Sequence, residues 1–282
     1  MMLTLDEIWK RYGETLVTPK EHAPKDRFFM SELGFVKEGR LIGNPSSCVR
    51  ASYWSFNHEK ETNPPDETSQ INFRMGDFFQ YLALQILHKN GAKIIDIERP
   101  IKFTPTCLNH AISGRIDAVE IVKNEEILLE IKSYNSRWTA KKIENAREPM
   151  ISHVLQLGFY LLATGIPWGK LVYINKIPDY KTKQYILTEF PVTCNGFTIE
   201  ESLNTYQVAS VINHLASIEE ALLKKALPAP SFGADPKAFE CRVCAYRERC
   251  FTIEEKQPLD KKSFKPFTIN RQTVKRAVKD SE

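Results

Sequence analysis

The sequence lacks several features that mark common protein classes. It has no apolar run long enough to cross a bilayer, and no basic start followed by an apolar stretch, as an export signal would have. We therefore expect an intracellular, cytoplasmic protein without membrane contact, in the host cell if the chain is viral. It also has no Gly-x-x-x-x-Gly-Lys-Ser/Thr phosphate loop and no dinucleotide fingerprint, which argues against an ATP-driven motor such as a helicase.

Charge of one sign and sequence repetition are also scarce. Lys and Arg number 39 against 35 Asp and Glu, and this net charge of +4 is only a weak indication of a polyanionic partner. The 42% hydrophobic content is enough for a sizeable core in a chain of 282 residues. We predict an N-terminal helical and loop segment (1–43), a main domain (44–252) and a basic C-terminal tail (253–282). The tail is interpreted as a disordered arm, a short helix on nucleic acid or a solubilising terminus.

Hydrophobic periodicity predicts the remaining elements. It indicates helices over 71–90 and 198–225 and strands over 92–103, 169–175 and 184–191. A further helix running towards Phe56 is predicted, with Asn44 or Ser46 as its cap and Cys48 in its first turns.

The most informative stretch is a predicted hairpin of two strands, Ala111 to Val122 and Glu126 to Ser133. Because side chains alternate along a strand, Glu130 and Lys132 point to the same face. Asp117 and Glu130 could hold a hard divalent cation, which prefers oxygen ligands. Lys132 would then lie beside the cation. The alternative is a salt-bridged pair of strands on the solvent face of a sheet.

A second pattern follows in the segment 150–165, which is predicted to be a helix closed by Gly165. His153, Gln156 and Tyr160 fall on one face of this helix. Taken alone, Tyr160 would be a core aromatic residue and Gln156 a surface amide.

In this order and spacing, the motifs resemble the RecB-like branch of the PD-(D/E)XK nuclease superfamily. That group has an Asp after Gly-x-x, a Glu-x-Lys one strand later and a Gln-x-x-x-Tyr helix. The resemblance implies a restriction-endonuclease-like α/β fold, with a mixed central sheet flanked by helices. It also implies a set of catalytic residues: Asp117, Glu130, Lys132, Gln156 and Tyr160. A Mg²⁺ or Mn²⁺ ion would be bound by Asp117, Glu130 and the carbonyl of Ile131.

One position departs from the family pattern. The helix that usually reads Gly-x-x-x-His reads Gly76 to Gln80 here, so that Gln80 stands where the family has a metal-binding histidine. A neutral amide oxygen is a weaker ligand than imidazole for manganese-like ions but is acceptable to magnesium. Asp77 is an alternative ligand. The departure keeps open a catalytically weak or inactive nucleic-acid-binding protein with the same fold.

Basic residues with an interleaved tryptophan follow the central hairpin. Such a pattern suits a groove that tracks a nucleic-acid strand, with phosphates held by charge and a base stacked on Trp138. The alternative is a solvated helix whose tryptophan packs inward. The predicted nucleic-acid-binding residues are Arg115, Arg137, Trp138, Lys141, Lys142 and His153.

Three clustered cysteines, Cys241, Cys244 and Cys250, indicate metal binding, since disulfides are not expected in a chain without an export signal. The candidates for a fourth ligand are Cys48, Cys107 and Cys194. One cysteine before the nuclease motifs and three after them is also the order in RecB-like nucleases that carry an iron-sulfur cluster. These include the CRISPR-adaptation exonucleases, the AddB subunit of bacterial end-resection complexes and the eukaryotic Okazaki-fragment nuclease-helicase.

This resemblance implies that Cys48 completes a 4Fe-4S site that joins the N- and C-terminal parts of the domain. Zinc, which four thiolates also bind, is the competing interpretation, and a buried free cysteine is the alternative for Cys48. The function predicted from the sequence is a Mg²⁺- or Mn²⁺-dependent DNA exonuclease acting on single strands or DNA ends. The pathway would be recombination, repair, viral DNA processing or CRISPR adaptation. The alternative is a non-catalytic subunit with a structural metal site, and a protein partner or homo-oligomer is left open.

Overall fold

The computed structural model describes residues 25–38, 40–202 and 204–256. The amphipathic helix expected near the N-terminus and most of the basic tail lie outside these ranges. In the described part of the chain, no helix is both long and apolar enough to span a bilayer.

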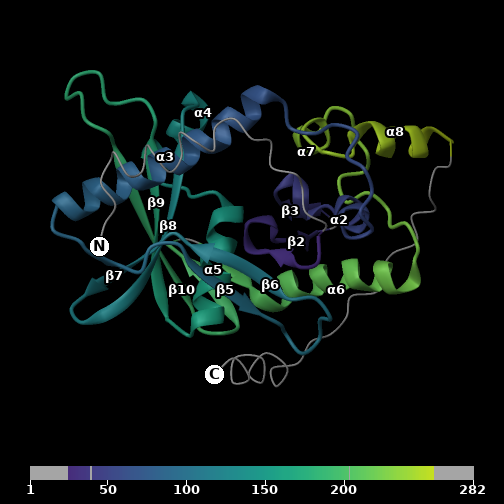
Figure 1. Cartoon of the computed structure of the whole chain (residues 1–282), viewed down its shortest axis with the longest axis horizontal. Coiled ribbons are helices and arrows are strands. Elements are labelled where there is room, and N and C mark those ends of the chain that lie inside the picture. The colour runs from purple at the N-terminus through teal and green to yellow at the C-terminus, as the bar shows by residue number, and fades with distance from the viewer. Residues whose placement is uncertain (1–24, 39, 203, 257–282) are drawn as a thin grey trace.

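A seven-stranded mixed sheet forms the centre of the protein (Figure 1). The two neighbouring strands β8 and β9 are parallel, whereas the other neighbouring pairs of this sheet are antiparallel. In spatial order the strands are β12 (Asn204–Gln207), β11 (Thr198–Glu201), β10 (Leu187–Cys194), β9 (Trp168–Asn175), β8 (Glu125–Tyr134), β7 (Ala118–Val122) and β4 (Lys93–Ile95).

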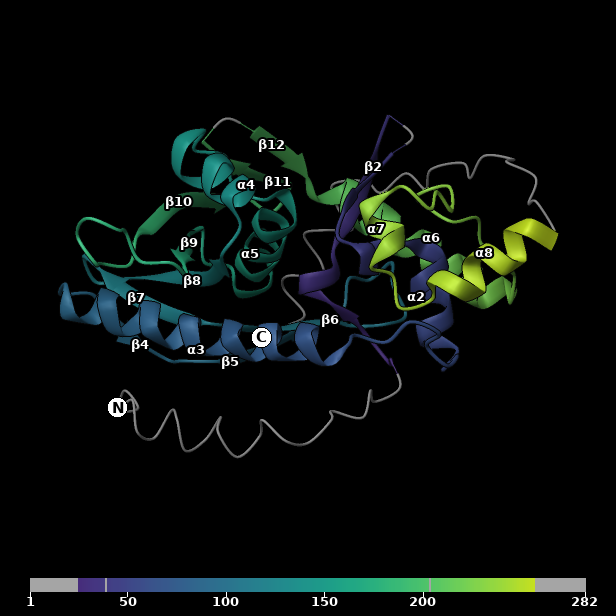
Figure 2. The same ribbon diagram turned by 90° about the horizontal axis from the view of Figure 1, so that it is seen from above.

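Two helices cover opposite faces of this sheet (Figure 2). Helix α5 (Ile151–Thr164) packs on the face that includes Leu128 of β8, and helix α3 (Glu67–Lys89) packs on the face that includes Leu129. The alternation of side chains along β8 therefore sends successive residues into two different cores. The predicted mixed sheet flanked by helices is present.

Sequence signals place the ends of both helices. Asp66 caps α3, because its side chain accepts a hydrogen bond from the backbone N–H of Ser69 at 2.7 Å. The helix therefore begins at Glu67, before the predicted start at 71. Gly165 ends α5 in the left-handed conformation, with φ of 72°, as predicted.

The predicted strands over 92–103 and 111–122 are each divided between two sheets. The first becomes β4 and β5 (Arg99–Phe103), separated by a bend in which Asp96 and Glu98 have positive φ. The second becomes β6 (Ile112–Ile116) and β7. Strand β6 pairs with both β5 and β1 (Phe28–Phe29), and these three strands form a separate sheet. Asp117 lies at the break between β6 and β7.

The predicted helix over 198–225 is wrong in its first ten residues. These residues form the β11–β12 hairpin, and helix α6 begins only at Val208 and runs to Lys224. Ile199 of the hairpin is fully buried against the main core, and β11 pairs with the edge of β10. Tertiary pairing at the sheet edge thus overrides the helical pattern of the sequence.

The other elements lie beside the sheet and include strands where only helix and loop were expected before residue 43. Helices α2 (Val49–Phe56), α7 (Phe239–Arg242) and α8 (Arg247–Lys256) gather on one side of the molecule, away from the central sheet (Figure 2). Helix α6 follows β12 directly and shares the main core with the sheet. The remaining elements of the described chain are η2 (Met30–Glu32), β2 (Gly34–Lys37), β3 (Arg40–Gly43), η3 (Pro45–Ser47), α4 (Arg137–Ala140) and the π-helical turn η4 (Lys141–Asn145).

Candidate active site

Asp117, Glu130 and Lys132 converge on the face of the sheet that α5 covers. Ala118 pairs with Leu129 across β7 and β8, so continuing this antiparallel register places Asp117 opposite Glu130. Lys132 Nζ lies 2.6 Å from Glu130 Oε1, and one Asp117 carboxylate oxygen accepts a hydrogen bond from the backbone N–H of Ile131 at 2.6 Å. The predicted common face of Glu130 and Lys132 is confirmed.

The Glu130 carboxylate is fully buried, with 0% of its surface exposed. Although Lys132 Nζ is close, neither carboxylate oxygen has a hydrogen-bond partner of acceptable geometry. An unsatisfied buried carboxylate is costly, and a divalent cation with oxygen ligands is one group that would satisfy it. A salt-bridged pair on a solvent-exposed face does not describe this site.

The electrostatics of the three side chains agree with a cation site. Burial, and then the charge of Glu130, raises the pKa of Asp117 well above its usual value, and burial also raises the pKa of Glu130. Burial alone would lower the pKa of Lys132, but the charges of Glu130 and Asp117 raise it overall, so the ammonium group stays charged at neutral pH. A divalent cation would favour the ionised form of both carboxylates, and the oxygen atoms of these two side chains therefore fit a Mg²⁺ or Mn²⁺ ion.

Gln156 and Tyr160 lie next to the strand that leads into Asp117. The Tyr160 hydroxyl donates to the carbonyl of Arg115 at 2.9 Å and accepts from its N–H at 3.0 Å, while Gln156 Nε2 donates to the same hydroxyl at 3.2 Å. Both side chains are buried, so Gln156 is not a surface amide. A Cβ at Gly114 would stand 2.6 Å from the Tyr160 ring and hydroxyl, and the Gly-x-x-Asp spacing thus makes room for this contact.

Tyr160→Phe is expected to lower the free energy of unfolding by about 1–3 kcal/mol, because both backbone groups of Arg115 lose their buried partner. The shift of the Asp117 segment should also slow any cleavage. Urea denaturation of the purified variant would measure the first effect. Tyr180→Phe is the matched control, since the Tyr180 side chain is 86% exposed and its hydroxyl supports no buried group. Equal stability of the two variants would contradict the anchoring role of Tyr160.

His153 comes from the first turn of α5. Its Nδ1 lies 2.9 Å from the hydroxyl of Tyr173, which also accepts a hydrogen bond from the backbone N–H of Met150 at 2.9 Å. The Tyr173 hydroxyl proton is therefore available to His153. Burial, followed by the positive charge of Lys132, lowers the pKa of His153 well below its usual value, so the ring is neutral at pH 7. Tyr173 was not predicted, since an apolar strand gave no sign of it.

Gln80 approaches from the other side of the sheet. It lies on α3, whose apolar residues pack on the face of β8 opposite Glu130 and Lys132. The Gln80 Nε2 atom is buried and has no hydrogen-bond partner. The structure shows no hydrogen bond between Gln80 and the carboxylates of Asp117 and Glu130. The roles of Gln80 and of the Ile131 carbonyl as metal ligands stay predictions.

The predicted nucleic-acid-binding residues on α4 and η4 are mostly exposed. Trp138 does not pack inward, because 65% of its surface is exposed, and the Lys142 ammonium lies 5.8 Å from its ring centroid. Arg137 and Lys141 are also exposed. Arg115 is exposed too, and its guanidinium lies 3.4 Å from a carboxylate oxygen of Glu98.

An anchor that the sequence did not reveal holds α4 and η4 in place. Glu144 Oε1 accepts hydrogen bonds from the Tyr134 hydroxyl at 2.5 Å and from Asn175 Nδ2 at 2.9 Å. Tyr134 ends β8 and Asn175 ends β9, so one carboxylate fixes the turn to the carboxyl ends of both parallel strands. The only sequence signal was a polar residue at each strand end.

The four predicted metal-binding cysteines line one cavity, although Cys48 is almost 200 residues from the others along the chain. Burial, with the charges of neighbouring sulfurs that include Cys48, raises the pKa values of Cys241 and Cys244 to about 11. Metal binding would therefore have to displace protons from these thiols.

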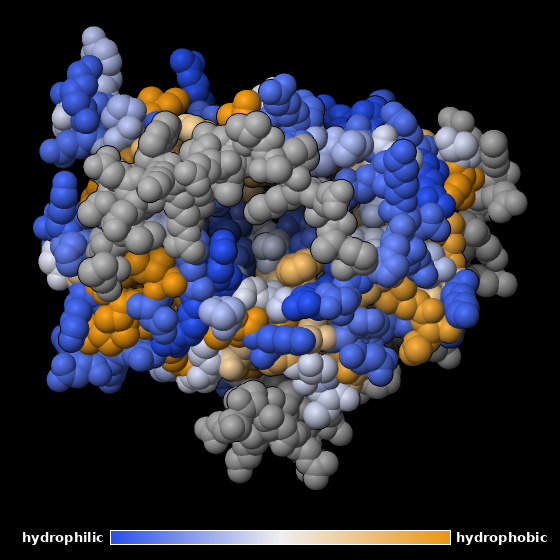
Figure 3. Space-filling model, viewed as in Figure 1, coloured by the Kyte–Doolittle hydropathy of each residue, from blue (hydrophilic) through white to orange (hydrophobic). Residues whose placement is uncertain are grey.

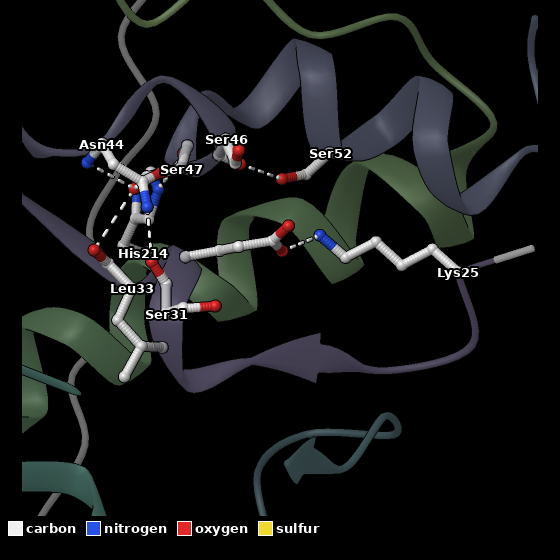
Figure 4. A network of polar contacts seen from close by, with 9 residues as sticks. Lys25, Ser31, Leu33, Asn44, Ser46, Ser47, Ser52 and His214 are labelled. Carbon is white, nitrogen blue, oxygen red and sulfur yellow. Dashed lines mark hydrogen bonds and ion pairs between the residues drawn. The ribbon is translucent and has the colours of Figure 1, made fainter. Parts of the chain in front are cut away.

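Cys48 is the N-cap residue of α2, in place of the predicted Asn44 or Ser46. A network of polar contacts around Ser47 and His214 holds the turn that precedes it (Figure 4). His214 of α6 lies with Nε2 2.7 Å from the carbonyl oxygen of Ser47, and burial lowers the pKa of His214. The Ser47 hydroxyl donates to the carbonyl of Leu33 at 3.2 Å. The turn before Cys48 is therefore fixed both to α6 and to Leu33, the residue that precedes β2.

Arg50 is a further residue of this cavity that the sequence did not single out. Its side chain is fully buried; Nε donates to the carbonyl of Pro228 at 2.7 Å and Nη1 to the sulfur of Cys250 at 3.4 Å. Arg50 thus joins α2 to the C-terminal segment beside the cysteines.

The thiols share a cavity but are not assembled at ligand distances. Within the described ranges, no group of three or more His, Cys, Asp or Glu side chains has the geometry of a metal site. The donor set itself, four cysteines around one cavity, fits either an iron-sulfur cluster or zinc.

Comparisons with known proteins give the family. No curated protein matches the sequence. Among solved structures, the chain is similar to the protein SSO0001, with 20% identity and a TM-score of 0.45 over 89% of this chain and 98% of that one. It is also similar to the alkaline exonuclease LHK-Exo of Laribacter hongkongensis, with 12% identity and a TM-score of 0.41 over 77% of this chain and 96% of that one. The complex of LHK-Exo with dAMP gives the same identity and score over 71% and 89% of the two chains. Residues 45–251, most of the chain, match the sequence model of one family, and the protein therefore belongs to the PD-(D/E)XK nuclease superfamily.

Proposed function

We propose that the protein is a Mg²⁺- or Mn²⁺-dependent deoxyribonuclease that hydrolyses phosphodiester bonds, acting as an exonuclease on single strands or DNA ends. The observation that carries this proposal is the fully buried Glu130 carboxylate, unsatisfied by hydrogen bonds and placed between Asp117 and the Lys132 ammonium. The proposed nuclease domain spans residues 44–252. DNA recombination, repair, viral DNA processing and CRISPR adaptation are pathways that use such an activity.

In the proposed reaction, Asp117, Glu130 and the Ile131 carbonyl hold the cation. The cation, when bound, would polarise the phosphate and lower the pKa of a water molecule. The Lys132 ammonium would orient the attacking water and offset the negative charge that builds on the phosphate in the transition state. Gln156 and Tyr160 would keep the Gly114–Asp117 segment in register through their contacts with the Arg115 backbone.

We also propose that Cys48, Cys241, Cys244 and Cys250 bind a structural 4Fe-4S cluster, with zinc as the competing metal. The cysteines share a cavity although they are far apart in the sequence, which supports a metal site that links the N- and C-terminal parts of the domain. Metal ligation by residues so far apart would contribute directly to the stability of the fold.

The experiment that tests the activity is a cleavage assay with end-labelled oligonucleotides, single- and double-stranded, in Mg²⁺, Mn²⁺, Ca²⁺ or EDTA. We expect products in Mg²⁺ or Mn²⁺ and none in EDTA. A circular single-stranded substrate separates the modes, since an exonuclease leaves it intact. Binding without cleavage in either metal would overturn the proposal and favour the alternative of a non-catalytic DNA-binding or partner-binding subunit, to which Gln80 in the family's histidine position points.

A further inference from the structure

The loop of residues 176–186, which joins β9 to β10, carries an aromatic ring and lysines at its exposed tip. Its exposed tip carries Tyr180, Lys181 and Lys183, and the Lys183 ammonium lies 4.2 Å from the Tyr180 ring centroid. The loop projects beyond α3 at the upper left of Figure 1, and in Figure 3 the same projection is largely hydrophilic. The Tyr180 side chain is 86% exposed.

The base of the loop is fixed in the core. Tyr185 packs edge-on against Phe79 of α3, with ring centroids 5.8 Å apart, and the Lys176 ammonium lies 5.8 Å from the same Phe79 ring. The tip is held by Asp179, whose Oδ1 accepts hydrogen bonds from the backbone N–H groups of Lys181 and Thr182 at 3.0 and 2.8 Å. The one acidic side chain of the tip is therefore engaged within the loop, while its two lysines face solvent.

The loop and α4 both leave the sheet at the carboxyl ends of its strands (Figure 1). Because β8 and β9 are parallel, their carboxyl ends coincide, and the backbone N–H of Lys176 donates to the carbonyl of Tyr134 at 2.7 Å. Glu130 and Lys132 lie within the last five residues of β8. Two elements that each combine an exposed aromatic ring with lysines thus follow the carboxyl ends of β8 and β9. Glu130 and Lys132 lie near the same end of β8, while the base of the loop packs on α3, on the opposite face of the sheet.

We propose that this loop is a second binding element for single-stranded DNA, in which Tyr180 stacks on a base and Lys181 and Lys183 contact phosphates. This inference rests on the proposed function and adds to it a strand path that runs from the loop to Trp138. Stacking of bases on exposed aromatic rings beside basic side chains is the usual means of holding single strands without sequence preference. The preformed tip needs little ordering when the strand binds, which favours affinity.

Fluorescence anisotropy with a labelled single-stranded oligonucleotide in Ca²⁺ tests the loop without depending on cleavage. We expect Tyr180→Ala to weaken binding about ten-fold and Tyr180→Phe to stay within about two-fold, since stacking needs the ring and not the hydroxyl. The double variant K181Q/K183Q should reduce the slope of log K against log salt by about 1.4, as expected for the loss of two phosphate contacts on a single strand.

The double variant K93Q/K123Q is the matched control. Lys123 lies in the β7–β8 turn at the opposite end of β8, is exposed and has positive φ like Lys183, while Lys93 is exposed on β4. Its affinity and salt slope should equal those of the wild type. If the wild type binds DNA and the Tyr180→Ala and K181Q/K183Q variants bind it equally well, the role of the loop is overturned and the proposed function is not. A wild-type protein that neither binds nor cleaves DNA would instead overturn the proposed function.

Discussion

Lys132→Ala is expected to lower the rate constant of DNA cleavage by about 10²–10³-fold, the usual loss when one preorganised group that stabilises transition-state charge is removed. The Lys132 ammonium lies 2.6 Å from Glu130 and keeps its charge at neutral pH. Without it, the charge that develops on the phosphate loses the positive partner that β8 holds beside Glu130. Single-turnover cleavage of an end-labelled oligonucleotide at saturating Mg²⁺ would measure the loss, and thermal unfolding would verify that the variant is folded.

Lys170→Ala is a close control for this variant. The Lys170 side chain has nearly the same exposure as that of Lys132, 24% against 26%, and also pairs with a glutamate, Glu120, at 3.0 Å. It lies on the neighbouring strand β9, on the face that α3 covers, away from Asp117 and Glu130. We expect it to cleave at the wild-type rate. Wild-type cleavage by the Lys132→Ala variant would rule out the proposed role of this lysine.

Cys241→Ser is expected to lose the bound metal and to lower the melting temperature by roughly 10 °C. A structural metal site contributes its binding free energy to folding, and a loss of about 3–5 kcal/mol shifts the melting temperature of a domain of this size by that amount. Anaerobic purification, quantified iron and sulfide, and absorption near ~400 nm would identify an iron-sulfur centre in the wild type. A colourless protein with stoichiometric zinc would favour the competing metal.

Cys107→Ser is the appropriate control, because Cys107 does not line the cavity of the four cysteines. It should retain both metal and stability. If the Cys241→Ser variant has the same metal content and melting temperature as the wild type, the four-cysteine site does not exist in the proposed form.

Several parts of the fold were predictable because they depend on local patterns. The mixed α/β architecture, confirmed by the family match, followed from apolar strands alternating with helices. The end of α5 followed from Gly165, whose positive φ is easily adopted only by glycine. The β11–β12 hairpin was mistaken for the start of a helix because its stability comes from pairing with β10, a partner that a local pattern does not contain.

The common face of Glu130 and Lys132 also followed from sequence, since the alternation of side chains along a strand is a local property. What the sequence did not indicate was the break after Ile116, which places Asp117 between two sheets and leaves its side chain to reach across to β8. The anchoring of Tyr160 on the Arg115 backbone was equally hidden, because it joins residues 45 positions apart through a contact that Gly114 permits. The catalytic and DNA-binding roles of these residues stay predictions.

The sequence by itself determined which chemical groups this protein has and the order in which they occur: two carboxylates and a lysine on a hairpin, an amide and a phenol on a helix, and cysteines near both ends. These follow from residue type and local periodicity. Only the tertiary structure decided that the Glu130 carboxylate is buried without a hydrogen bond, that Cys48 lines one cavity with the C-terminal cysteines, and that the 176–186 loop and α4 follow neighbouring strand ends. Burial and long-range contacts depend on how the sheets and helices pack together, and no short segment of sequence specifies that packing.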